Sequence, residues 1–82
     1  FSAYPNPFNP SVNIPFELAT QAHMVLNIYD LKGKKVATLM DKFLSEGVHE
    51  VNWNASSNAS GVYVCALESD GWISTSKLIL IK

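Results

Sequence analysis

Side chains that could perform acid–base or nucleophilic chemistry are few in this sequence and lie far apart. His23 and His49 fall in different strand-like runs, and neither has an acidic residue at a catalytic spacing. The serines lie in loop-like stretches, outside any nucleophile-elbow pattern. Triad catalysis requires a nucleophile, a base and an orienting acid in mutual contact. We therefore expect no catalytic residues and predict that the chain is not an enzyme.

Metal-binding and redox side chains are equally scarce. Cys65 is the only cysteine, which excludes an internal disulfide, and a lone cysteine is no metal cluster. It lies in the apolar run Val62–Leu67, so we interpret it as a small buried hydrophobic residue.

Turn chemistry explains the three aspartates, Asp30, Asp41 and Asp70. An alternative oxygen site is a calcium ion bound by Asn52, Asn54 and Asn58 together with loop carbonyls. That loop lacks the carboxylates that a tight calcium site needs. We therefore expect neither a metal nor a cofactor.

The two tryptophans could support a different kind of binding, because exposed aromatic rings on a flat sheet can stack on sugar rings. Trp53 shares one face of its run with His49 and Val51, which favours a core position. Trp72 directly follows the turn formed by Asp70-Gly71. It either covers that hairpin or is a candidate carbohydrate contact.

Length and charge limit the class of protein. The 82 residues suffice for a single domain, 1–82, with one modest core. A net charge of −1, with lysines but no arginine, does not predict the basic surface that binds nucleic acid. The longest apolar run, Val62–Leu67, is far shorter than the ~20 residues of a membrane-spanning helix, so no transmembrane segment is expected.

The ends of the sequence give a further expectation. The chain begins with Phe1 and shows no signal-peptide pattern, so we expect a fragment of a longer polypeptide. It ends at Lys82 directly after a strand-like run, which suggests the natural C-terminus of the parent protein.

Glycine-containing turns divide the chain into strand-like runs. Asp30-Leu31-Lys32-Gly33 is typical of a type I turn, and Asp70-Gly71 of a two-residue hairpin. The runs between the turns predict six strands, at 12–18, 23–29, 34–40, 48–53, 61–68 and 72–81. This spacing predicts an all-β fold, an Ig-like β-sandwich of six to seven mostly antiparallel strands.

Two details of the strands bear on their placement. Pro15 lies on the polar side of the first run, which predicts an edge strand. The fifth and sixth runs are apolar on both faces, so they should lie centrally, or one of their faces should meet a partner.

Prolines and asparagines alternate at the start of the chain. Each proline fixes its own φ and pushes the preceding residue toward extended geometry. Residues 1–11 therefore form a stiff, Pro-rich lead-in that cannot be helical, ahead of the sandwich at 12–82. Its motif residues are Tyr4, Pro5, Asn6, Pro7, Phe8, Asn9 and Pro10.

In their order, these motifs resemble the type A C-terminal sorting domain of the bacterial type IX secretion system, itself similar to the Ig-like domain of flagellar hook-capping proteins. The resemblance covers the whole chain. It rests on the blocks Tyr4–Ser11, Ile28–Leu39 with Gly33, Gly47–Asn54, Ser60–Val64 with Gly61 and Tyr63, and Lys77–Lys82. One departure is Asn54-Ala55, where the family often has Asp-Gly after the tryptophan.

The resemblance implies a secretion and sorting signal. Such a domain forms the C-terminal part of a larger cargo protein and directs that cargo through the periplasm, across the outer membrane and to the cell surface or beyond. The implied partners are an outer-membrane translocon and a surface sortase, which would cut upstream of or near Phe1.

The last strand is the candidate recognition element. Its residues, the partner-binding set of this prediction, are Lys77, Leu78, Ile79, Leu80, Ile81 and Lys82. A strand with two apolar faces at a chain end can be shared by edge addition to a partner sheet. Two alternatives remain: a carbohydrate-binding module of a secreted polysaccharide-degrading enzyme, and a passive structural Ig-like module.

Overall fold

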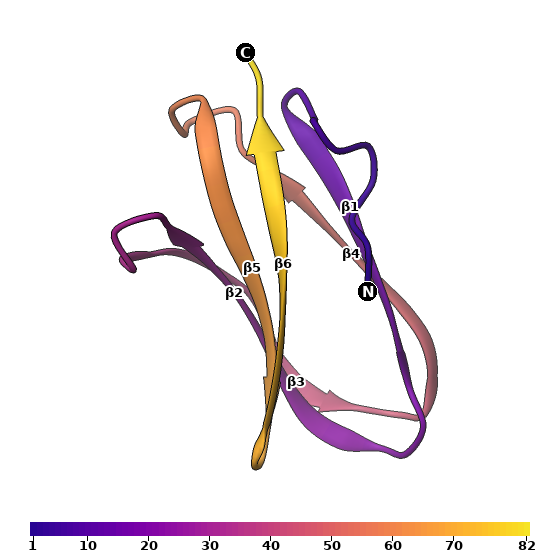
Figure 1. The fold of residues 1–82 in the computed structure, drawn as a ribbon. Helices are drawn as coiled ribbons and strands as arrows, with labels where there is room; N and C mark the ends of the chain where they lie inside the picture. The colour runs from indigo at the N-terminus through magenta and orange to yellow at the C-terminus, as the bar shows by residue number, and fades with distance from the viewer.

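Six β-strands and no helix make up the computed structural model, which describes residues 1–82. The strands are β1 (Ser11–Leu18), β2 (Ala22–Asp30), β3 (Lys35–Leu44), β4 (Gly47–Asn54), β5 (Gly61–Ser69) and β6 (Trp72–Leu80). They pair in two antiparallel sheets, with strand orders β1-β4 and β3-β2-β5-β6 (Figure 1). The prediction of an all-β sandwich is confirmed.

The structure contains no helix with the length and hydrophobicity that a membrane crossing needs.

Turn chemistry sets the positions of the hairpins. In the β2–β3 turn, Asp30 Oδ1 accepts hydrogen bonds from the backbone N–H groups of Lys32 and Lys34, both at 2.9 Å. Gly33 closes that turn with φ +83°, a conformation that favours glycine. Both predicted glycine turns therefore form, and they fix the pairing of β2 with β3 and of β5 with β6.

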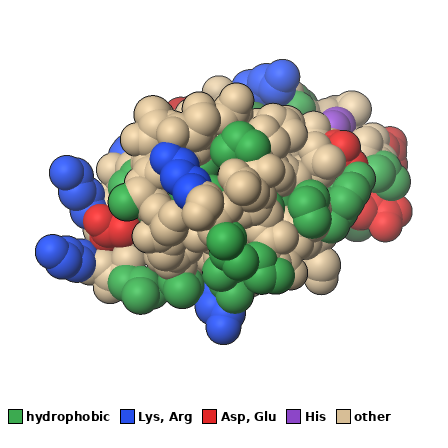
Figure 2. All heavy atoms as spheres, turned by 90° about the horizontal axis from the view of Figure 1, so that it is seen from above, with side chains coloured by type: hydrophobic (Ala, Val, Ile, Leu, Met, Phe, Trp, Pro, Cys, Tyr) green, Lys and Arg blue, Asp and Glu red, His purple; other side chains and the backbone are tan.

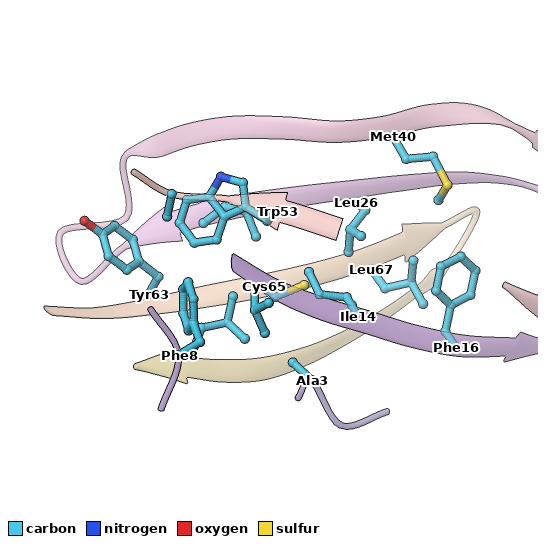
Figure 3. Packing of buried hydrophobic residues seen from close by; sticks show 14 of the residues in the cluster. Ala3, Phe8, Ile14, Phe16, Leu26, Met40, Trp53, Tyr63, Cys65 and Leu67 are labelled. Atoms are coloured by element: carbon cyan, nitrogen blue, oxygen red, sulfur yellow. The ribbon is translucent and has the colours of Figure 1, made fainter. Parts of the chain in front are cut away.

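The core lies between the two sheets. The strictly alternating residues of β1 place Val12, Ile14 and Phe16 inward, where they meet Leu26 of β2 and Leu67 of β5 (Figure 3). The prediction for Trp53 is confirmed, because its side chain is only 5% exposed. Its ring lies 5.8 Å from that of Phe8 and 5.4 Å from that of Tyr63, so the three aromatic rings fill one end of the core.

Predictions of strand placement are partly confirmed. Pro15 lies in β1, an edge strand of the two-stranded sheet, as expected. β5 is central, but the expectation of a central position for β6 is wrong, because β6 forms an edge of the four-stranded sheet. Its inner face is buried only at Leu78 and Leu80, while Ser74 and Ser76 interrupt it and Trp72 at its start is half exposed.

Asp41 is also wrongly placed by sequence reasoning, which assigned it to a turn. β3 continues through Asp41 to Leu44, and Asp41 pairs with Val25 of β2. Pairing along the full length of β2 overrides the low strand propensity of aspartate.

Leu26 is one of the fully buried side chains of this small core, so its truncation tests the core directly. Leu26→Ala removes a fully buried side chain and should lower the free energy of unfolding by about 2–5 kcal/mol. The matched control Leu31→Ala changes the same residue type at a position that is 72% exposed, and should change stability by less than about 0.5 kcal/mol. Chemical denaturation measures both values, and equal losses would contradict the described core.

Candidate functional site

The last strand, which sequence reasoning selected as the recognition element, has two unequal faces. Leu78 and Leu80 point inward, with 0% and 1% exposure, and belong to the core. Ile79 is partly exposed on the outer face, and Ile81, just after β6, is 53% exposed. Lys77 and Lys82 are exposed at either end of this segment. Side chains accessible to a partner are therefore those of the odd-numbered residues and Lys82.

The C-terminal part of the outer backbone edge of β6 is closed by the proline-rich segment, which we define as Tyr4–Pro10. Phe8 N–H donates to Ile79 O, and Ile81 N–H donates to Phe8 O, both at 2.9 Å. The side chain of Asn6 also forms two hydrogen bonds with the backbone of β6. Its Nδ2 donates to Lys77 O at 2.8 Å, while its Oδ1 accepts from Ile79 N–H at 2.9 Å.

Asn6 thus replaces a backbone peptide unit in the ladder. A primary amide carries one donor and one acceptor side by side, as a peptide group does. Pro7 has no N–H, so the backbone around it cannot supply that donor. The Asn-Pro alternation therefore lets a segment that is poor in backbone donors still pair with a strand.

This arrangement corrects the expectation that the last strand can be shared by edge addition. Four consecutive outward backbone groups, from the carbonyl of Lys77 to the N–H of Ile81, already have partners. A partner strand would have to displace the proline-rich segment to reach them. The sequence showed the segment as stiff and extended, but nothing in it indicated which edge the segment would cover.

The same segment also pairs with the other sheet. Tyr4 exchanges two backbone hydrogen bonds with Asn13 of β1, at 2.9 and 2.8 Å. Tyr4 Oη donates to Glu50 Oε2 of β4 at 2.6 Å, and this bonded carboxylate raises the pKa of the Tyr4 hydroxyl above its usual value. Phe8 is 2% exposed and packs on Trp53. The proline-rich segment therefore bridges the edges of both sheets.

The remaining motif residues stabilise the end of the sandwich that carries the last strand. Tyr63 is buried, and its hydroxyl donates to Ala59 O of the β4–β5 loop at 2.6 Å. Gly61, at the start of β5, has φ +151° and pairs with Leu80. Lys82 is held against the same loop, because its N–H donates to Ser60 Oγ and its Nζ to Ser56 O.

Trp72 lies at the other end of β6 and is 50% exposed. It lines a shallow groove with Phe1, Pro15, Phe16 and Val48 among its neighbours. Both alternatives for Trp72, covering the hairpin and contacting carbohydrate, stay predictions.

The acid–base side chains do not gather at one place. Sequence reasoning found no acidic partner for His23, but His23 Nε2 lies 2.6 Å from Asp41 Oδ1 because the β2–β3 pairing brings them together. Both side chains are more than half exposed. His49 Nε2 hydrogen-bonds Ser45 O at 2.8 Å, and its ring stacks on Phe16. No group of three or more histidine, cysteine, aspartate or glutamate side chains is placed to hold a metal ion.

Comparison with family models identifies a match over nearly the whole chain. The model of a family described as "Secretion system C-terminal sorting domain" matches residues 2–82, nearly the whole chain. No curated protein matches it.

Removing the Asn6 amide should weaken the closure of β6. Asn6→Ala deletes two hydrogen bonds to β6 and should lower the free energy of unfolding by about 1–2 kcal/mol. Asn9→Ala is the matched control, because Asn9 is exposed and its side chain makes no hydrogen bond within the chain. Chemical denaturation of both variants checks this, and equal stability would mean that Asn6 does not hold the strand.

Cys65 should make the fold sensitive to alkaline pH. Burial raises the pKa of its thiol from 9.0 to about 12. In the unfolded chain the thiol ionises from about pH 9, so stability should be fully present below that pH and fall toward pH 12, by at most about 1.4 kcal/mol per pH unit. Cys65→Ala should remove this slope, measured by denaturation at pH 8 to 11, whereas an unchanged slope would assign it to other groups.

Proposed function

Because the chain belongs to the family of secretion system C-terminal sorting domains, we propose that the machinery recognises its last strand through the exposed or partly exposed side chains of Lys77, Ile79, Ile81 and Lys82. The domain is a C-terminal sorting signal for type IX secretion, which exports its cargo across the outer membrane to the cell surface or the medium. A sorting signal of this kind is not itself catalytic. It acts by being recognised.

The observation that carries this proposal is that only some groups of the last strand are accessible to a partner. Its backbone edge is occupied by Asn6 and Phe8, and its inner side chains are in the core. The outward side chains combine two isoleucines with a lysine at each end. Exposed aliphatic groups of this kind, with charges at the rim, suit a protein interface.

The partners in this proposal are the outer-membrane translocon and a surface sortase. The cargo is covalently joined ahead of Phe1, and the sandwich at 12–82 with its lead-in at 1–11 folds as a single domain, 1–82. The translocon would need the intact outer face of the strand. The sortase would act at the junction with the cargo, upstream of or near Phe1.

Export of a reporter joined ahead of Phe1 tests the proposal in a bacterium with type IX machinery. Deleting residues 78–82 is a poor test alone, because it also removes the buried Leu78 and Leu80 and can unfold the domain. We predict that Ile81→Ser, at an exposed site, lowers export roughly tenfold by removing an apolar contact with the partner.

Ile73→Ser is the matched control, since Ile73 is an exposed isoleucine near the opposite end of β6 from Ile81. It should export as well as the parent, with both variants melting at the parent temperature. Reporter held in the periplasm would locate the defect at the translocon, and surface reporter with an uncut tail would locate it at the sortase. Parental export of the Ile81→Ser fusion would refute the proposal.

A further inference from the structure

The outer face of the four-stranded sheet is not covered by any other part of the chain, since β1 and β4 pack on its inner face alone. Four outward apolar side chains lie together on it. Val62 of β5 pairs with Ile79 of β6, and in the next row Val64 of β5 pairs with Tyr29 of β2. All four are partly exposed. We call Tyr29, Val62, Val64 and Ile79 the outer apolar patch.

A polar network ends this patch on one side. Asn27 Nδ2 donates to Glu68 Oε2 and to Tyr29 Oη, and Asn27 Oδ1 accepts from Thr38 Oγ1. The patch therefore extends from Asn27 toward the end of the sandwich that carries the β2–β3 turn and Lys82. This is the end onto which the last strand runs.

Lysines border the patch along both sides. Lys35 of β3 pairs with Tyr29, and Lys77 of β6 pairs with Val64, so one row across the sheet consists of a lysine, two patch residues and a second lysine. Three other lysines, Lys32, Lys34 and Lys82, lie at the same end. The one acid there, Asp30, has its carboxylate engaged by two backbone N–H groups of the turn.

Acidic residues gather at the opposite end of the molecule. That end carries the β1–β2, β3–β4 and β5–β6 turns, and its acids are Glu17, Asp41, Glu46, Glu68 and Asp70. Figure 2 looks down on the basic end, where lysines are spread around the left and centre and most acidic side chains lie to the right. Although the net charge is only −1, most lysines and most acidic residues therefore lie at opposite ends of the molecule.

We propose that the outer apolar patch and its flanking lysines, Lys35 and Lys77, dock on an acidic protein surface of the secretion machinery, one with an apolar centre and carboxylates around it. This deepens the proposed function, on which it rests, by extending the recognised surface from the last strand to β2, β3 and β5. An apolar centre with cationic flanks is complementary to such a surface, and the charge separation orients the domain with its basic end first.

A second copy of the chain fits this face poorly. A two-fold dimer through the patch brings the same surfaces together, so Lys35 and Lys77 of one copy would approach lysines of the other. Like charges placed together across an interface are costly. Charge therefore favours a different, acidic partner.

Charge reversal on β3 tests this inference. Lys35→Glu changes a residue of β3, 37 positions before β6 begins at Trp72, and it should reduce export of the reporter fusion roughly tenfold by placing a carboxylate against the acidic partner. Lys42→Glu is the matched control. It is the same charge change at an exposed site of the same strand, at the other end of the sheet, and it should export normally.

Outcomes for this inference and for the proposed function are separable. Parental export of Lys35→Glu, together with loss of export in Ile81→Ser, would overturn the wider surface and leave the proposed function standing. Equal losses in Lys35→Glu and Lys42→Glu would also overturn it. Val64→Thr gives a second test should Lys35→Glu melt early. It keeps the shape and strand propensity of valine, and it should lower export at an unchanged melting temperature.

Two measurements on the purified reporter fusion exclude other occupants. Sedimentation equilibrium should show a monomer, and the fusion should not float with phosphatidylglycerol vesicles at low salt. A dimer that Lys35→Glu dissociates would assign the patch to a second copy. Flotation that Lys35→Glu abolishes would assign it to an anionic membrane. Either result would overturn the inference.

Discussion

Pairing of the proline-rich segment with both sheets is the constraint on which the rest of the structure depends. Tyr4 is hydrogen-bonded to β1, and Asn6 and Phe8 are hydrogen-bonded to β6, so one short segment ties together edges that belong to different sheets. Phe8 extends from the same segment into the core beside Trp53. The segment thereby covers an edge strand that would otherwise offer unpaired backbone groups to other chains.

This closure has a direct consequence for recognition. With the backbone edge occupied and Leu78 and Leu80 in the core, what remains of the last strand for a partner is its outward side chains. These are continuous with apolar side chains of β5 and β2 and with lysines on both sides. The surface proposed for recognition therefore exists only in the folded domain, where residues distant in sequence lie together.

Much of the fold could be predicted from the sequence, because local patterns determine it. Alternation in β1, the Asp30–Gly33 turn and the Asp70-Gly71 turn each specify structure within a few residues, and all three are as expected. Long-range pairing could not be predicted. The position of β6 at an edge, the extension of β3 through Asp41 and the proximity of Asp41 to His23 depend on which strands meet. The role of Asn6 could not be predicted for the same reason, since its hydrogen-bond partners lie more than seventy residues away in the sequence.

Amide hydrogen exchange in the intact fusion protein tests most directly whether the proline-rich segment closes this edge. β6 supplies an internal control, because it also carries an N–H group on the same edge that the segment does not cover. The N–H groups of Ile79 and Ile81 bond to the proline-rich segment, whereas that of Thr75 points to the same edge beyond the reach of the segment. We predict slow exchange at Ile79 and Ile81 and fast exchange at Thr75. Exchange at Ile79 and Ile81 as fast as at Thr75 would show an open edge and contradict the account.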